Sequence, residues 1–425
     1  MGILAVIVVS FLALLGVPLF VIMATAAIFC LHYIAQVNPA VTIAEIYRIA
    51  SAPTLIAIPL FTFAGYILAE SKAPERLVRL NRALFGSMPG GLALVTLIAC
   101  AVFTSLTGAS GVTIIALGGL LFPALIQDRY SERFSLGLMT SCGSLGLLFA
   151  PSLPLIIYGL VGSVNVDKLF LAGVFPGILL IILLGTYSVY IGKKTKVVRQ
   201  KFAWKEAFLA LKEAAWELPL PVIVLGGIFS GVITVGEAAA ATAFYVFVIH
   251  LFVYRDVKFQ DLPQIMKESM VLVGAILIIL GCAMGFTNFL VDQLVPQKAL
   301  AYLQQHIHSK LVFLIMLNLF LLVVGCLMDI FSAIVVVVPL IVPIATSFGV
   351  DPVHLGIIFL TNLEIGYLTP PVGINLFIAS SRFNKPVIDL YNASIPFLIV
   401  LLIGLVIITY WPDLSLTLVR MAHIR

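Results

Sequence analysis

The sequence predicts an all-α polytopic membrane protein built from two inverted repeats, each with about five spanning helices and one re-entrant hairpin. Three observations support this fold class. Hydrophobic residues make up 62% of the chain and charged residues only 10%, well outside the range of soluble domains. Apolar runs long enough to cross a bilayer recur throughout the chain. Two similar interruptions of these runs lie 220 residues apart.

The apolar runs place the spanning helices. We expect spans near residues 3–15, 18–35, 53–69, 134–160, 169–192, 219–234, 237–254, 271–287, 354–380 and 391–411. The first two runs are separated by Gly16–Pro18 and are alternatively one long broken helix. The first residues carry no basic cluster, so the N-terminal run is interpreted as a retained span and not as a signal peptide.

Two further apolar blocks, 90–126 and 312–347, have two apolar arms around a small or polar centre. The centres are Thr104–Gly111 and Gly325–Asp329. An arm of about 14 helical residues reaches only about 21 Å, short of the roughly 30 Å hydrocarbon core. Both blocks are therefore predicted to be re-entrant hairpins.

Two spans are interrupted where a membrane helix should continue. One interruption is Ser141–Gly146 followed by Pro151, and the other is Thr361–Gly366 followed by Pro370 and Pro371. Unsatisfied backbone groups are tolerated in a membrane only where protein or a polar cavity surrounds them. Paired broken helices in matching positions of two halves point to the binding site of a transporter.

The basic residues predict the orientation. No Lys or Arg falls inside a predicted span, and eighteen of the 24 lie on one side of the layout. The positive-inside rule assigns that side to the cytoplasm. Both termini are then periplasmic, the first hairpin enters from the cytoplasm, and the second enters from outside.

The two halves align at a constant offset of 220 residues. Six identical Gly or Pro pairs fall at this offset: Gly16/Gly236, Gly65/Gly285, Pro123/Pro343, Gly146/Gly366, Pro151/Pro371 and Pro176/Pro396. Each half has an odd number of crossings, so the copies are inverted. The predicted units are a first repeat (1–195, with hairpin 90–126 and broken helix 134–160), an amphipathic interfacial arm (196–217) and a second repeat (218–425, with hairpin 312–347 and broken helix 354–380).

Three acidic residues lie at predicted membrane depth: Asp329 at the tip of the second hairpin, Glu364 in the second broken helix, and Glu237 near a span start. Intramembrane carboxylates are costly and usually face a cavity or a partner. No embedded Lys or Arg is available to pair with them. Asp329 and Glu364 therefore either belong to a binding site or cap a half-helix N-terminus, and a helix-start role is at least as well supported for Glu237.

The polar clusters beside the hairpins supply the oxygen ligands that sodium needs, and unwound backbone adds carbonyls. Two Na⁺ sites are predicted, one from Ser105, Thr107, Ser110, Ser141 and Ser144, and its mirror from Gly325, Met328, Thr361, Asn362 and Thr369. The alternative for any single hydroxyl is helix–helix hydrogen bonding. Repetition of the cluster at the same offset favours ion sites.

Four half-helix ends meet near the predicted midplane, where their dipoles favour an anion. The candidate substrate ligands are Asp329, Ser110, Ser152, Thr369 and Asn375. We find no arrangement of residues for nucleophilic catalysis, so the sequence favours a transporter over an enzyme. We find no ATP-binding module either, so uphill transport would use an ion gradient or a separate subunit.

Several motifs resemble the large membrane subunit of tripartite ATP-independent periplasmic (TRAP) transporters, and the likeness extends over essentially the whole chain. They are Phe103–Gly111, Gly236–Ala240, Gly325–Ile334, Pro339–Pro343 and Gly356–Phe377. The run Asn362–Leu376 is the most specific of these. One departure is Val235-Gly236, where the family often has Pro-Thr, and it puts only the local geometry of that corner in doubt.

The resemblance implies a sodium-driven importer of an organic anion in the bacterial inner membrane. A periplasmic substrate-binding protein would deliver the substrate, and a small four-helix membrane subunit on a separate chain would complete the scaffold. The hairpins and broken helices would move as an elevator. Sialic acid is the favoured substrate, closest to that branch of the family, and a C4-dicarboxylate is the next.

Two other functions fit a similar architecture. A stand-alone sodium/dicarboxylate symporter would need no soluble partner, and a passive anion channel would not accumulate its substrate. A membrane-embedded enzyme is the least supported alternative.

Overall fold

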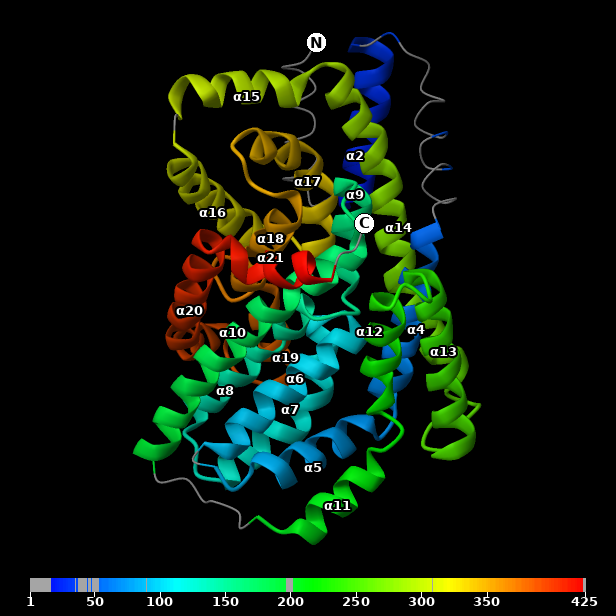
Figure 1. Cartoon of the computed structure of the whole chain (residues 1–425), viewed down its shortest axis with the longest axis vertical. Helices are drawn as coiled ribbons and strands as arrows, with labels where there is room; N and C mark the ends of the chain where they lie inside the picture. The colour runs from blue at the N-terminus through cyan, green and yellow to red at the C-terminus, as the bar shows by residue number, and fades with distance from the viewer. Residues whose placement is uncertain are drawn as a thin grey trace.

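The structure is a computed structural model that describes residues 17–34, 53–88, 90–195, 202–307 and 309–422, with residues 36, 44 and 47. Every regular element in these ranges is a helix, which confirms the all-α class (Figure 1). Within them, seven helices are long and apolar enough to span a membrane, and a bent pair, Glu132–Leu148 with Leu153–Gly162, is an eighth candidate. The predicted span 3–15 lies outside the described residues.

The elements of the first half run in chain order along residues 19–194. They are α2 (Leu19–Phe29), η1 (Cys30–Ile34), η2 (Pro53–Ile56), α4 (Ala57–Glu70), α5 (Ala73–Phe85), α6 (Gly91–Thr107), α7 (Ser110–Gln127), α8 (Glu132–Cys142), η3 (Leu145–Leu148), α9 (Leu153–Gly162) and α10 (Val166–Lys194).

A connector of α11 (Trp204–Glu213) and α12 (Pro219–Phe229) leads into the second half. Its elements are α13 (Val235–Val248), η4 (Ile249–Val253), α14 (Leu262–Asp292), α15 (Val295–His306), α16 (Lys310–Leu327), α17 (Ile330–Ser347), α18 (Pro352–Gly366), α19 (Ile374–Phe383), α20 (Val387–Tyr410) and α21 (Pro412–Met421).

Side-chain caps mark where several of these helices begin. Ser131 caps α8, Asn165 caps α10 and Asp351 caps α18, each accepting a hydrogen bond from a backbone N–H of the first turn. Thr234 and Glu237 form a reciprocal capping box at the start of α13. Glu237 therefore has the helix-start role that the sequence left open.

Some predicted boundaries need correction. The expected span 219–234 contains only α12, whose 11 residues reach about 16 Å. Helices α5, α15 and α21 were not predicted, because their mixed polar and apolar sequences resemble loops. In the expected arm 196–217, residues 196–201 lie outside the described part, and α11 covers ten of the others.

The two expected hairpins are present, although their arms are longer than predicted. Helices α6 and α7, like α16 and α17, have 17 or 18 residues each and reach about 26 Å. Each pair turns within two residues, at Gly108–Ala109 and at Met328–Asp329. Gly108 takes φ +69°, a conformation that favours glycine. The arms turn back because this tight turn interrupts them, and not because they are short.

The order of the elements repeats between the halves. Helix α7 begins at Ser110 and α17 at Ile330, and α8 and α18 begin at Glu132 and Pro352, at the predicted offset of 220 residues. Corresponding elements lie at opposite ends of the molecule: α5 lies at the bottom of Figure 1, and α15 lies at the top. This arrangement agrees with inverted copies.

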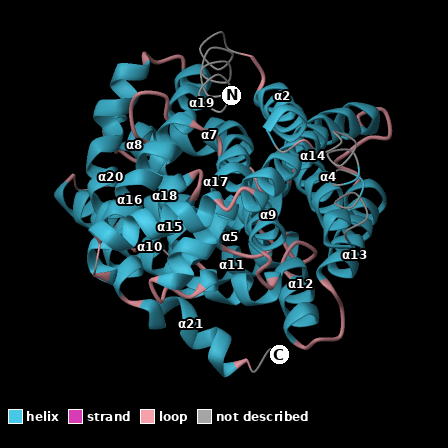
Figure 2. Cartoon of the chain, turned by 90° about the horizontal axis from the view of Figure 1, so that it is seen from above, coloured by secondary structure: helices cyan, strands magenta, loops and turns pink. Residues whose placement is uncertain are grey.

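The helices form two groups side by side (Figures 1 and 2). Helix α4 packs against α13 and α14, and α2 packs against α14, with α12 beside them; we call this group the scaffold. The second group, the hairpin group, contains the hairpins α6–α7 and α16–α17, the broken helices, and α10 and α20. Within it, α7 packs against α19 and α17 packs against α9, so each hairpin contacts the broken helix of the other half.

Candidate functional site

Both predicted interruptions are present as breaks in the helical backbone. The first lies between α8 and α9, with the short 3₁₀ turn η3 inside it, and the second lies between α18 and α19. Each contains a cis peptide bond, Ala150-Pro151 and Pro370-Pro371. Some backbone carbonyls in these breaks accept only local turn or side-chain hydrogen bonds, as Gly146 does from the Phe149 N–H and Gly143 from Thr104, so a second lone pair on each oxygen is available to a ligand.

Each break lies against the first arm of its own hairpin, at a glycine. A Cβ atom added to Gly146 would lie 2.3 Å from the carbonyl oxygen of Ala101 and 2.6 Å from the backbone nitrogen of Ser105. One added to Gly366 would lie 2.4 Å from the carbonyl carbon of Gly325. Ser105 and Gly325 occupy matching positions in the two halves. The segments that carry the predicted residues of each half therefore meet at a backbone-to-backbone contact.

At the first hairpin–break junction, the hydroxyl of one threonine links three helices by hydrogen bonds. Thr104 Oγ1 donates to the carbonyl oxygen of Gly143 (2.8 Å) and shares a hydrogen bond with Thr113 Oγ1 (2.7 Å). Thr104 was not among the predicted ligands, although it lies in the polar centre of the first hairpin. The predicted Ser105 and Thr107 hydroxyls donate to carbonyls of their own helix, at 2.8 and 3.0 Å. Their oxygens keep lone pairs that a cation could use.

At the second junction, the amide of Asn362 is held by a residue that sequence reasoning missed. Asn362 Nδ2 donates to Asn318 Oδ1 (2.7 Å), and Asn318 Nδ2 donates to Thr409 Oγ1 (3.2 Å). The predicted Thr361 and Thr369 hydroxyls donate to carbonyls one turn back in the chain. A lone asparagine in the apolar run of α16 was the available signal for Asn318.

The two halves meet at Ser110, the first residue of α7. Its Oγ donates to Oδ1 of Asn375, the second residue of α19, over 2.8 Å. Both side chains are buried. Two predicted substrate ligands from opposite halves are thus in direct contact, at the N-terminal ends of two half-helices where the dipoles favour an anion.

Unpartnered polar atoms concentrate around the breaks. Eight buried side-chain atoms in the described part have no hydrogen-bond partner, and five of them belong to the broken helices: Ser141 Oγ, Ser152 Oγ, Asn362 Oδ1, Glu364 Oε1 and Asn375 Nδ2. A buried polar group without a partner costs about 1–3 kcal/mol, so native proteins rarely leave several in one place. The cluster is therefore the candidate site for a polar or charged ligand.

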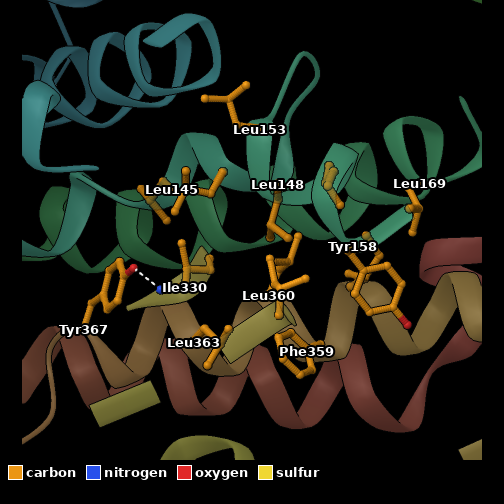
Figure 3. Packing of buried hydrophobic residues seen from close by; sticks show 14 of the residues in the cluster. Leu145, Leu148, Leu153, Tyr158, Leu169, Ile330, Phe359, Leu360, Leu363 and Tyr367 are labelled. Carbon is orange, nitrogen blue, oxygen red and sulfur yellow. Dashed lines mark hydrogen bonds between the residues drawn. The ribbon is translucent and has the colours of Figure 1, made fainter. Parts of the chain in front are cut away.

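Asp329 has the capping geometry that the sequence offered as an alternative. Its Oδ1 accepts from the backbone N–H groups of Phe331 and Ser332, both at 3.0 Å, and the Ser332 hydroxyl contacts its other oxygen. The neighbouring Ile330 N–H donates to the hydroxyl of Tyr367 over 2.6 Å (Figure 3). The second hairpin tip is thereby attached to the second break.

The site has no basic side chain among the described residues, and apolar side chains surround it. Leu145, Leu148, Phe359, Leu360 and Leu363 pack together around the breaks (Figure 3). Among the buried polar residues of the described part there is no Lys or Arg, and Glu364 is only 2% exposed. In such a dry setting a small cation and an organic anion would each strengthen the binding of the other, because electrostatic interactions are weakly screened.

A multi-pass helical membrane protein with two hairpins that meet two broken helices is the architecture of a transporter permease. The chain matches the family "Tripartite ATP-independent periplasmic transporter, DctM component" over residues 6–414, and it belongs to this family. The resemblance recognised in the sequence is thereby confirmed, and the chain is a transporter permease component.

Similar proteins agree with this assignment, and one solved structure has a similar fold. The chain is 35% identical to the C4-dicarboxylate TRAP transporter large permease protein DctM of Pseudomonas aeruginosa, over 88% of each chain. It is 34% identical to the sialic acid TRAP transporter large permease protein SiaM of Vibrio cholerae, over 86% of each. The YdaH transporter of Alcanivorax borkumensis has a similar fold, with a TM-score of 0.64, 14% identity, and coverage of 89% of this chain and 88% of its own.

Proposed function

We propose that this chain carries an organic anion across the bacterial inner membrane, driven by a sodium gradient. The observation that carries the proposal is the cluster of unpartnered polar atoms at the two breaks. Hydroxyl, amide and carbonyl oxygens are the ligands that sodium prefers. No buried Lys or Arg in the described residues could neutralise the anion in place of sodium.

In this proposal one sodium ion binds at each hairpin–break junction. The first ion uses oxygens near Ser105, Thr107, Ser141 and Ser144, and the second uses Thr361, Asn362, Thr369 and the carbonyls of Gly325 and Met328. The anion binds between them, at Ser110, Ser152, Thr369, Asn375 and Asp329. The positive ions offset the substrate carboxylate and Asp329, so a half-loaded carrier keeps an uncompensated charge that hinders its crossing.

The hairpin group would move past the scaffold as an elevator. Support comes from the way the helices divide: the site residues all belong to the hairpin group, and the two groups meet along α4 and α14. A body that contains the entire site can carry its ligands without breaking the contacts that form it. Both termini are placed in the periplasm, because the basic residues then face the cytoplasm.

Two partner proteins complete the proposed transporter. Large permeases of this family work with a small membrane subunit and a periplasmic binding protein. We propose that both are separate chains here.

The substrate is proposed to be sialic acid, with a C4-dicarboxylate as the second candidate. Relatives named for these two substrates are almost equally similar to this chain, at 34% and 35% identity. The chemistry of the site favours the first. A lining of hydroxyls, amides and one carboxylate, with no basic side chain among the described residues, suits one carboxylate on a polyhydroxylated body better than two carboxylates, which would need more positive charge.

The test is uptake into proteoliposomes that contain the chain with its small subunit. We expect labelled sialic acid to accumulate only with an inward sodium gradient and with the binding protein outside. Replacing sodium by choline should abolish accumulation. Uptake of free substrate without the binding protein would indicate a stand-alone symporter, and equilibration without accumulation would indicate a channel. Either result overturns the proposal, and accumulation of succinate alone would overturn the choice of substrate.

A further inference from the structure

A cavity of about 410 Å³ lies outside the proposed transport site, where the start of α8, the end of α10 and α20 come together. One part of its lining is polar: Ser131, Arg133, Lys194 and Thr195. The other part is apolar: Phe134, Tyr187, Ile191, Ala393, Pro396 and Phe397. No acidic side chain lines it. The cavity is thus amphiphilic, and its charges are positive.

The cationic groups of this cavity are available to a ligand. Arg133 donates from Nε and Nη2 to the carbonyl oxygen of Asn392, at 3.3 and 2.9 Å, and its Nη1 has no hydrogen bond within the described residues. Lys194 is exposed and forms no ion pair there. The nearby Glu132 pairs with Lys385 at 2.5 Å, and Asp389 lines a neighbouring cavity that also contacts Arg133. Their carboxylates therefore do not fill the cavity.

The apolar part is a fixed aromatic wall. The ring of Phe134 stacks on Tyr130 (5.1 Å between centroids) and contacts Phe397 (5.5 Å), and Tyr187 meets Phe397 edge-on (5.2 Å). Because the rings hold one another, the wall persists without a ligand. Aromatic side chains at the end of a spanning helix are typical of the membrane–water interface. The cavity therefore lies where lipid headgroups are expected.

We propose that this cavity binds an anionic phospholipid. The phosphate would lie between Arg133 and Lys194, and one acyl chain would follow Tyr187, Ile191 and Phe397 toward the hydrocarbon. Basic pockets between membrane helices commonly hold lipid headgroups. A soluble phosphate would use only the polar end and would leave the apolar wall exposed to water, so the lining favours a lipid. The proposal does not depend on the transport mechanism.

The test is native mass spectrometry of the full chain in mild detergent, with phosphatidylglycerol or phosphatidylcholine of the same acyl chains added in steps. Lys194→Glu places a negative charge in the cavity. Lys193→Glu is the matched control, because it makes the same charge change on the next residue, which does not line the cavity. We expect phosphatidylglycerol binding to weaken on the order of tenfold in Lys194→Glu and to stay near wild type in Lys193→Glu.

Three results would overturn the proposal. They are equal retention of phosphatidylcholine, an equal effect of the two lysine variants, and displacement of the bound lipid by glycerol 1-phosphate at matching concentrations. Arg133→Gln provides a second variant with the same expected direction. Equal thermal-unfolding midpoints of all variants would show that a lost lipid does not reflect a lost fold.

Discussion

At the scale of single residues, Asn375 connects the two halves at the site. Its Oδ1 accepts from Ser110 and its buried Nδ2 has no partner. We expect Asn375→Ala to lower sodium-driven uptake at least tenfold, since it removes one donor of the proposed anion site and one contact between the halves. The measurement is initial uptake at fixed binding-protein concentration. Ser381→Ala, on the exposed face of the same helix, is the control. Wild-type uptake by Asn375→Ala would remove this residue from the site.

Gly366 allows the second break to touch the second hairpin. In Gly366→Ala the new methyl group would collide with the backbone of Gly325. We expect a loss of about 1–3 kcal/mol of stability, because backbone cannot move aside as a flexible side chain can. Gly274→Ala is the control, since nothing lies within 4 Å of its Cβ position. Thermal unfolding in detergent compares the two, and equal midpoints would contradict the close contact.

Asp329 combines a capping geometry with a proposed charge. Asn caps helices about as well as Asp, so Asp329→Asn keeps the cap and removes the charge, whereas Asp329→Ala removes both. We expect both variants to lose most sodium-coupled uptake, and only the Ala variant to lose about 1 kcal/mol of stability. Uptake measured beside thermal unfolding separates the two roles. Normal uptake by the Asn variant would leave Asp329 as a cap alone.

At the scale of elements, α5 is held in place by one half-buried arginine. Arg76 donates to Glu217 (2.5 Å) and Asp256 (2.8 Å), its guanidinium lies over the ring of Tyr254, and its side chain is 12% exposed. We expect Arg76→Ala to cost roughly 3–5 kcal/mol, because two buried carboxylates lose the guanidinium that pairs with both of them. Arg79→Ala is the control on the same helix.

Arg79 also has two acidic partners, Glu206 and Glu213, but all three side chains are exposed, at 41–47%. Water screens such pairs, so its removal should change the unfolding midpoint little. A larger effect for Arg79 than for Arg76 would mean that the exposed arm α11, and not the buried network, holds α5.

At the scale of the whole molecule, Asp256 joins the halves and should make stability depend on acid. Burial raises the pKa of Asp256, but hydrogen bonds and charges from His250 and Arg76 outweigh it and lower the pKa from 3.8 to about 2. The ionised Asp256 carboxylate therefore contributes about 2 kcal/mol to the free energy of unfolding. This contribution is complete above roughly pH 4 and is lost as the pH falls through 2. Asp256→Asn should have a flatter stability profile between pH 4 and pH 2. Parallel profiles would contradict this prediction.

The sequence predicted the features that depend on local chemistry. The breaks follow from Gly146 and Gly366 with their downstream prolines, and the hairpin tips follow from Gly108 and Asp329. These residues act through backbone geometry and polarity, which a single chain reveals.

Features that depend on packing could not be predicted in the same way. Thr104 is important because its hydroxyl contacts the carbonyl oxygen of Gly143, and Asn318 is important because it contacts the amide of Asn362. Local sequence does not reveal that either pair of residues lies close together. Helix α5 was not predicted because arginines in a polar segment are typical of a surface loop. Their role becomes clear only in the fold, where Glu217 and Asp256, far along the chain, contact Arg76. The ion and substrate roles of the site stay predictions.

Each hairpin packs on the broken helix of the opposite half, as α7 does on α19 and α17 on α9. The proposed anion site takes residues from both halves, so neither half can form it alone. A primordial half-length polypeptide would therefore have needed a second, upside-down copy to function, and fusion of the genes would have fixed that pairing. Separately expressed segments should accordingly regain transport only when both are made together.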